Sequence, residues 1–172
     1  MTDHLSSPPA HLPRQRLHKV RAQQVICATG AFERPLVFGG NDLPGVMLSS
    51  AVQTYLQRFG VICGSRAVLI TNNDEAYRTA FYMQASGCFI HSIIDLRHRI
   101  RPALAKQVKG ADIQLKLGYG ITAAHGVNKL ARIDIAPFSE TGAELTGSPE
   151  HIDCDLVMMS GGMTPAVHLH SQ

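Results

Sequence analysis

The middle of the chain alternates between short, uniformly apolar runs and a stretch with helical spacing. Residues 67–70 and 88–94 are almost entirely apolar, as strands buried on both faces of a parallel sheet are. Between them, apolar residues recur at helical intervals from 74 to 86, with Asn72 and Asn73 in place to cap the helix. The pattern predicts one strand–helix–strand unit of the parallel type.

Weaker signals on either side predict two more helices and five more strands. One helix is expected at 49–59, with Ser49 or Ser50 as its N-cap and Gly60 just past its end, and another at 101–109. Residues 31–45 and 139–149 are rich in turn formers and predict loops. The chain is therefore predicted to have an α/β fold with a small β-meander at 113–136. The five strands are expected at 24–28, 113–117, 120–125, 130–136 and 156–159.

The composition supports a folded protein and excludes several functional classes. Of the 172 residues, 45% are hydrophobic and 17% are charged, which is enough apolar material for a core. The net charge of +3 is too small to indicate nucleic-acid binding, and the basic stretch 14–21 resembles one exposed strand face. No apolar run approaches the ~20 residues of a membrane span, and residues 1–19 lack a signal-peptide core. We expect a cytoplasmic protein with neither nucleic acid nor membrane as a partner.

Neither the cysteines nor the histidines form a chemical motif. Cys27, Cys63, Cys88 and Cys154 are scattered and contain no C-x-x-C pair, which disfavours a redox disulfide and a zinc site. Their apolar surroundings predict buried, reduced thiols. No G-x-S-x-G nucleophile turn is present. The sequence thus indicates no metal site and no catalytic residue.

The loop that joins the first of the two central strands to the helix lies where the phosphate-binding loop of a Rossmann unit would be, but it lacks the glycines of that loop. Where G-x-G-x-x-G/A would stand, residues 71–76 read Thr-Asn-Asn-Asp-Glu-Ala, and only Ala76 fits. Asp74 and Glu75 bring negative charge to a helix N-terminus, where a pyrophosphate would bind. The same residues are good helix-capping chemistry. Two interpretations stay open here, a structural cap and a dinucleotide site that includes Asn73.

The end of the second strand allows the same two interpretations. Asp95 lies about 20 residues after the loop, the usual offset of a carboxylate that accepts the ribose hydroxyls of a dinucleotide. Arg97 and Arg99 follow it and are equally typical of a solvated turn.

Two short glycine turns flank this unit. An Ala-Thr-Gly turn at 28–30 follows one apolar run, and a Ser-Gly-Gly turn at 160–162 follows another. Together they match a layout in which one nucleotide-binding sheet is interrupted by a second domain. Both ends of the chain accordingly look like cuts through a larger protein.

Several long strings of the sequence resemble the α subunit of heterotetrameric sarcosine oxidases, which belongs to a wider set of flavoprotein subunits with two dinucleotide-binding domains. The most specific string runs from the Ala-Thr-Gly turn through ERPLVF and NDLPGV. The resemblance covers nearly the whole chain. Its segments are PRQRLHKVRAQQV (13–25), VICATGAFERPLVFGGNDLPGVMLSSAVQTYLQRFG (25–60), AVLITNNDEAYRTA (67–80), IIDLR (93–97) and CDLVMMSGGMTPAVHLHSQ (154–172).

This resemblance implies a piece of a glutathione-reductase-type fold, with a Rossmann-like, three-layer FAD/NAD(P)-binding domain. Residues 1–30 would be a lead-in and the end of an outer dinucleotide-binding domain. Residues 31–155 would be an inserted NAD(P)-binding-like domain with the β-meander, and residues 156–172 would return to the outer domain.

The resemblance also implies a function. Enzymes of this family demethylate sarcosine oxidatively to glycine, pass the one-carbon unit to tetrahydrofolate and form hydrogen peroxide. The α subunit carries NAD and works with β, γ and δ subunits, and the intact complex also holds FAD, FMN and tetrahydrofolate. For this stretch the family implies scaffold and cofactor binding rather than chemistry, and it leaves open whether the stretch alone binds any cofactor.

The site residues carried over from the family lie mainly in the two glycine turns. Ala28, Thr29 and Gly30 match the turn that lies against the dinucleotide of the outer domain, and Gly161 and Gly162 match the returning turn near the same ligand. The Thr-Asn-Asn-Asp loop resembles the family's own departure from the glycine pattern, which favours the capping interpretation.

One further residue of the family string has the chemistry to contact the same ligand. The guanidinium of Arg34, in the ERP segment, could reach a phosphate.

Other interpretations stay open. The same blocks occur in subunits of opine oxidase, cyanide synthase and dye-linked proline dehydrogenase. A free-standing NAD(P)-dependent reductase domain and a pure interaction module are alternatives from different classes. Binding of a nucleotide, and the substrate of the intact enzyme, would discriminate among them.

Overall fold

The computed structural model describes residues 4–141 and 146–171, which fall into two units. The larger unit, Gly30–Ala166, contains all the helices and strands of the described chain. The smaller unit, Met1–Thr29 with Val167–Gln172, has only turns and extended segments among its described residues. The strand predicted at 24–28 is therefore wrong. Val25 and Ile26 are exposed there, because an apolar segment is buried as a strand only where neighbouring strands pair with it.

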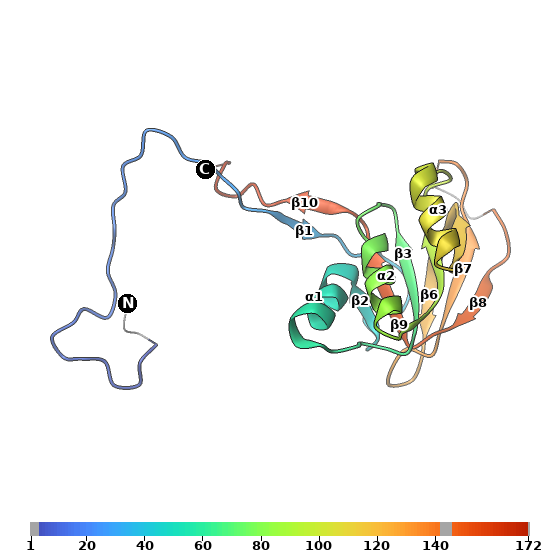
Figure 1. Cartoon of the computed structure of the whole chain (residues 1–172), viewed down its shortest axis with the longest axis horizontal. Helices are drawn as coiled ribbons and strands as arrows, with labels where there is room; N and C mark the ends of the chain where they lie inside the picture. The colour runs from blue at the N-terminus through green and yellow to red at the C-terminus, as the bar shows by residue number, and fades with distance from the viewer. Residues whose placement is uncertain (1–3, 142–145, 172) are drawn as a thin grey trace. The chain divides into compact units, whose positions relative to one another are not determined.

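A five-stranded parallel sheet forms the centre of the larger unit (Figure 1). Its last strand in the sequence enters between the first strand of the sheet and the second, so segments from the two ends of the unit lie side by side. The strands in order across the sheet are β2 (Val46–Leu48), β9 (Leu156–Ser160), β3 (Arg66–Thr71), β4 (Phe89–Asp95) and β5 (Gln114–Leu117).

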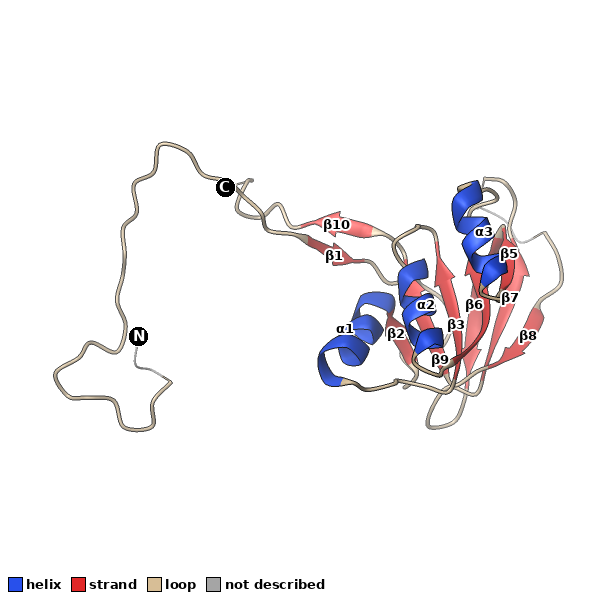
Figure 2. Ribbon diagram, in the orientation of Figure 1, coloured by secondary structure: helices blue, strands red, loops and turns tan. Residues whose placement is uncertain are grey.

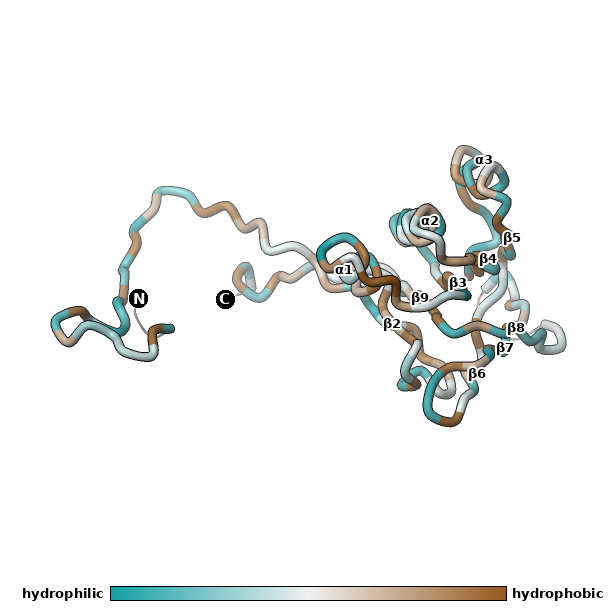
Figure 3. The backbone as a smooth tube through the Cα atoms, turned by 60° about the horizontal axis from the view of Figure 1, so that its bottom comes forward, coloured by the Kyte–Doolittle hydropathy of each residue, from teal (hydrophilic) through white to brown (hydrophobic). Residues whose placement is uncertain are grey.

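Helices cover one face of this sheet and an antiparallel meander covers the other, which gives three layers (Figure 2). In Figure 3 the turns of the helices change between hydrophilic and hydrophobic colours, as expected for helices with one buried face. The helices are α1 (Ser49–Phe59), α2 (Tyr77–Ala85) and α3 (Pro102–Gly110), and the meander strands are β6 (Tyr119–His125), β7 (Arg132–Pro137) and β8 (Glu150–Asp153).

The alternation of side chains along β3 explains why that strand is apolar throughout. Ala67 and Leu69 pack in the core between the sheet and the helices. Val68 and Ile70 pack in a second core between the sheet and the meander. All four are fully buried, because a central strand between two covering layers has no solvent-facing side. The predicted α/β class and the central strand–helix–strand unit are confirmed.

The meander prediction is right for two of its three strands. Residues 113–117 lie instead in β5, which pairs with β4 in the parallel sheet. The crossover through α3 brings the chain back parallel to β4, and this places β5 there. The third strand of the meander is β8, which pairs with β7 and lies next to the loop predicted at 139–149.

The predicted helices are confirmed, with differences at their starts. Gly60 ends α1 in the left-handed conformation at φ 66°, as expected. Neither serine caps α1: Leu48 is the N-cap, and the backbone N–H of Ser50 donates to Oε2 of Glu33 at 2.7 Å. The helix predicted from residue 74 begins at Tyr77, since residues 72–76 form a turn.

A two-stranded antiparallel ribbon leads into and out of the layered unit. It pairs β1 (Ala31–Glu33) with β10 (Met163–Pro165). These two strands and β2 have three residues each, too few for a sequence period to predict. Apart from β1, the stretch 31–45 is irregular, as expected.

Candidate functional site

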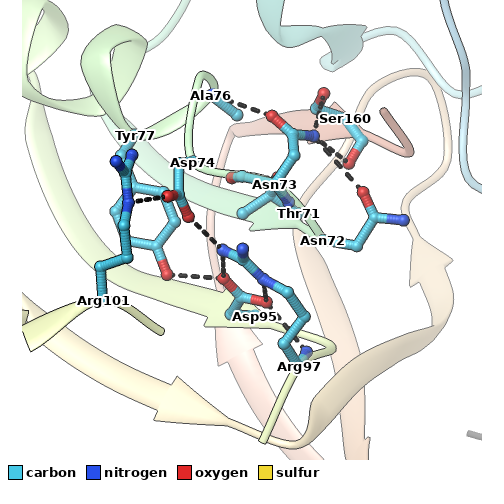
Figure 4. Close-up of polar contacts among 10 residues, drawn as sticks. All are labelled: Thr71, Asn72, Asn73, Asp74, Ala76, Tyr77, Asp95, Arg97, Arg101 and Ser160. Carbon is cyan, nitrogen blue, oxygen red and sulfur yellow. Dashed lines mark hydrogen bonds and ion pairs between the residues drawn. The ribbon is translucent and has the colours of Figure 1, made fainter. Parts of the chain in front are cut away.

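The carboxyl ends of three parallel strands meet at one edge of the sheet (Figure 4). Thr71, the last residue of β3, pairs with Ser160 at the end of β9 and with Asp95 at the end of β4. All three side chains are fully buried although all are polar. In open parallel sheets this edge is where ligands bind, so we take it as the candidate site.

The loop after β3 is held by its own side chains. The backbone N–H of Asn73 donates to Oγ1 of Thr71 at 3.1 Å. The side-chain amide of Asn73 donates to Oγ of Ser160 at 2.9 Å, and its Oδ1 accepts from the N–H of Ala76 at 3.2 Å. Asn73 therefore caps the turn that leads into α2 and also ties β3 to β9.

An ion-pair network lies beside this loop. Nη2 of Arg97 contacts Oδ1 of Asp74 at 2.8 Å and Oδ2 of Asp95 at 2.7 Å. Arg101 contacts the other oxygen of Asp74, and the hydroxyl of Tyr77 donates to Oδ2 of Asp95 at 2.7 Å. On its Oδ1, Asp95 accepts from the backbone N–H and from Nε of Arg97, at 2.9 and 3.0 Å. Both oxygens of the buried Asp95 carboxylate thus have donors within the chain.

The network fixes the charges of its members. Burial raises the pKa of Asp74, but the hydrogen bonds and charges of Arg97 and Arg101 more than offset it, so the net pKa is lowered. The hydrogen bond to Asp95 raises the pKa of Arg97. Burial, followed by the bond to Asp95, raises the pKa of Tyr77 well above its ordinary value. At neutral pH the carboxylate of Asp74 is ionised, and Tyr77 remains a neutral phenol.

The Ser-Gly-Gly turn after β9 is joined to Arg34. The N–H of Gly161 donates to the carbonyl of Arg34 at 2.7 Å, and the N–H of Arg34 donates to the carbonyl of Gly162 at 2.8 Å. Gly162 has φ +92°, and a Cβ there would lie 3.4 Å from Nη2 of Arg34. The structure thus brings together three of the predicted residues, and the Arg34 guanidinium lies against the backbone of Gly162.

The Ala-Thr-Gly turn is divided between the two units. Gly30 opens the larger unit with φ +73°, and a Cβ added to it would meet no heavy atom within 4 Å. Its carbonyl accepts from the N–H of Ala166 at 2.9 Å. Ala28 and Thr29 belong to the smaller unit and are exposed there.

Three members of the edge were missed from the sequence as parts of a site. Tyr77 was expected only as an apolar position of a helix, and Ser160 only as part of a turn. A solvated turn was one of the two interpretations left open for Arg97, whereas its side chain is 33% exposed and binds two carboxylates. A basic residue two positions after a strand-ending Asp was the available signal for this network.

The cysteines are free thiols, as predicted, but not all of them are buried. Cys88 and Cys154 are buried, Cys63 is partly buried and Cys27 is exposed. The prediction is wrong for Cys27 because its stretch forms no strand. Burial raises the pKa of Cys88 to about 11 and that of Cys154 to about 12. Within residues 4–141 and 146–171 no group of three or more His, Cys, Asp or Glu side chains is placed to hold a metal ion, and no helix there is long and apolar enough to cross a membrane.

Comparison with known proteins finds relatives among oxidoreductase subunits, although no protein-family model matches. The sarcosine oxidase α subunit of Corynebacterium sp. strain P-1 is 41% identical over 99% of this chain and 18% of its own length. That of Rhizobium meliloti is 36% identical over 96% of this chain and 16% of its own length. One opine oxidase subunit of Agrobacterium tumefaciens is 29% identical over 87% of this chain and 32% of its own length. The chain thus spans about a fifth of the sarcosine oxidase subunits that it matches.

Solved structures show the same fold at low sequence identity. Thioredoxin reductase of T. acidophilum has a TM-score of 0.64 and 20% identity, over 81% of this chain and 44% of its own. A ferredoxin reductase of Rhodopseudomonas palustris has a TM-score of 0.60 and 19% identity, over 84% of this chain and 35% of its own. The sequence resemblance and the predicted fold are both confirmed: over nearly all of its length this chain matches one segment of the sarcosine oxidase α subunits, and it has the fold of FAD- and NAD(P)-dependent oxidoreductases.

Proposed function

We propose that this chain is a cofactor-binding and scaffolding part of a sarcosine-oxidising flavoprotein complex. In such a complex sarcosine is demethylated oxidatively to glycine, the one-carbon unit passes to tetrahydrofolate and hydrogen peroxide forms. The α-subunit part would carry NAD, with FAD, FMN and tetrahydrofolate elsewhere in the complex and β, γ and δ subunits as partners. We assign no catalytic residue to this chain.

The domain division that we propose follows from this role. Because β9 lies between β2 and β3 in the five-stranded sheet, the inserted domain would extend over residues 30–166 rather than end at residue 155, and residues 1–29 and 167–172 would belong to an outer dinucleotide-binding domain. The β1–β10 ribbon would be the connection between them.

The observation that carries the NAD assignment is the joining of Arg34 to the Gly161–Gly162 turn by two backbone hydrogen bonds. Glycines with positive φ leave backbone groups uncovered for a ligand, and Gly30 and Gly162 both have such angles. A guanidinium beside the turn offers charge-assisted bonds to a phosphate. We propose that Arg34 and the Gly161–Gly162 turn hold the pyrophosphate of NAD. Gly30 lies at the other end of the β1–β10 ribbon, and with Ala28 and Thr29 it would contact another part of the same ligand, as the Ala-Thr-Gly motif predicts.

The second set of predicted residues fits NAD less well. Asn73 is bonded to Ser160 and Ala76, and both oxygens of Asp95 accept from Arg97. A ribose hydroxyl would have to compete with these partners. We therefore propose that Asn73 and Asp95 support the fold of the inserted domain, and that direct contact with NAD lies on the glycine side.

The experiment is capture of the native complex through a tag on this chain, followed by two assays. We expect sarcosine-dependent formation of hydrogen peroxide, and NAD released on denaturation in a fixed ratio to this chain. The Gly30→Val variant should assemble normally and lose its NAD. A captured complex that oxidises an opine or proline but not sarcosine would move the chain to one of the related enzymes, and normal NAD content in the variant would overturn the site.

A further inference from the structure

Helices α1 and α2 are neighbours on one face of the sheet (Figure 2). A small hollow lies between their first turns. Its volume is about 60 Å³. Ser49, Ser50 and Gln53 line it from α1, and Ala76 and Thr79 line it from the start of α2. Arg78 of α2 and Glu75 of the turn before it also line the hollow, and Glu33 and Met163 of the ribbon complete the wall.

The two helices begin at residues whose side chains make no capping hydrogen bond. The N-cap residues are Leu48 and Ala76, neither of which can cap with its side chain, and the first turn of each helix contains no acidic residue. A helix N-terminus carries about half a positive charge and several backbone N–H groups without helical partners. At the start of α2 several of these groups are already bonded within the chain, because Asn73 Oδ1 accepts from the N–H of Ala76, and the carbonyls of Glu75 and Ala76 accept from the N–H groups of Arg78 and Thr79. The end of α1 is therefore the one that favours an anion in the hollow.

A buried hydroxyl adds to these donors. The side chain of Ser49 is 1% exposed, and its Oγ has no hydrogen-bond partner among the described residues. Burial of a hydroxyl without a partner costs about 1–3 kcal/mol. Ser49 is one of the residues that line the hollow, so an oxyanion bound there would be an acceptor for this hydroxyl.

One of the backbone N–H groups at the start of α1 is already bonded to a carboxylate of the ribbon. Oε2 of Glu33 accepts from the N–H of Ser50 at 2.7 Å. Glu75, the other acidic residue of the wall, is paired with Arg78 at 2.8 Å. The charge that opposes an incoming anion is therefore chiefly that of Glu33.

We propose that this hollow is a binding site for one small oxyanion of the phosphate class, and that the Glu33 carboxylate is its intramolecular substitute. The oxyanion would accept from Ser49 Oγ and from the N–H of Ser50, and Glu33 would have to leave for it to bind. The site uses none of the residues proposed for NAD, so each proposal can fail without the other.

The test is calorimetric titration of the full chain with inorganic phosphate. Removing the competing charge in Glu33→Gln should tighten phosphate binding by at least about tenfold, which is ~1.4 kcal/mol. Asp112→Asn is the matched control, since it removes one negative charge just after α3, at a residue with φ 55° that Asn tolerates. The control should bind phosphate as the wild type does.

A second variant separates the site from general charge effects. Adding Ser49→Ala to Glu33→Gln should abolish the gain, while circular dichroism shows that the fold is retained. Equal gains in Glu33→Gln and Asp112→Asn, a gain that survives Ser49→Ala, or no phosphate binding by Glu33→Gln would each overturn the proposal. Titration with AMP distinguishes the source: binding of phosphate alone indicates a free ion, and binding of both indicates a phosphoryl group.

Discussion

The two sides of the carboxyl edge differ in how far their polar groups are satisfied within the chain. On the side of β3 and β4, Asn73, Asp74 and Asp95 are all bonded to neighbouring residues. On the side of β9, the backbone of the Gly161–Gly162 turn is bonded to Arg34, and Gly162 has positive φ. Gly30, at the far end of the β1–β10 ribbon, also has positive φ and has open space around it. A saturated polar network stabilises a fold, whereas uncovered glycine backbone can receive a ligand. The comparison shows that a Rossmann-like fold can form even where the position of its usual phosphate-binding loop is occupied by side chains that bond to one another.

The largest effect is expected on the β3–β4 side, where the polar side chains are bonded to one another. Asp95→Asn removes the buried partner of Arg97 and should lower the free energy of unfolding by about 3 kcal/mol, because a buried charge pair is then broken on one side. Urea denaturation followed by circular dichroism measures this loss. Tyr77→Phe is the control, since it removes a single hydrogen bond to the same carboxylate and should cost about 1 kcal/mol. Equal losses in the two variants would show that Arg97 does not depend on Asp95.

A smaller effect on stability is expected from a substitution at Gly162, on the β9 side. Gly162→Ala places a side chain at φ +92°, a conformation that costs an L-residue about 1–2 kcal/mol. Thermal denaturation measures that cost, and the NAD content of the captured complex should fall as well. Gly110→Ala is the control, because that glycine ends α3 with nothing within 4 Å of an added Cβ. Loss of stability in both variants alike would mean that the backbone angle at Gly162 is not the reason.

The sequence predicted those parts of the fold that local pattern determines. The unit formed by β3, α2 and β4 follows from apolar runs and helical spacing. Its strands were predicted to within one residue at each end, and its helix begins three residues later than predicted. The assignment of β5 failed because its four residues do not specify whether their partner is β4 or β6. That choice is made by the crossover through α3, which is a property of the whole sheet.

The candidate site was predictable to a smaller extent. The Gly161–Gly162 turn and Arg34 were found through resemblance, and the structure places them together. The Asp74–Arg97–Asp95 network was not predicted. The parallel strand–helix–strand unit places the ends of β3 and β4 at one edge, but the pattern does not show whether Arg97 turns toward the two carboxylates or toward solvent. The contact of Glu33 with α1 was not predicted either, because it joins residues 17 positions apart across two short strands.

The pH dependence of stability tests the charge of Asp74, on the β3–β4 side. The pKa of Asp74 lies below its ordinary value of 3.8, so the folded state binds this proton less readily than the unfolded state does. Its contribution to stability is therefore complete above pH ~4 and is lost as the pH falls through the folded pKa. Thermal denaturation between pH 7 and pH 3 should show a smaller acid loss in Asp74→Asn than in the wild type, by about 0.5–1 kcal/mol. Parallel curves for the two proteins would remove Asp74 from the network.

The smallest effect is expected at the outer member of the same network. The side chain of Arg101 is 75% exposed, whereas that of Arg97 is 33% exposed, although both contact Asp74. Arg101→Ala should cost at most about 0.5 kcal/mol, since exposed ion pairs are screened by water. Arg97→Ala should cost several times more, because it leaves the fully buried Asp95 without its counter-charge. Urea denaturation of the pair measures this ratio. If the two losses were equal, the network would act as one exposed cluster. The β3–β4 side would then have no buried ion pair to set it apart from the β9 side.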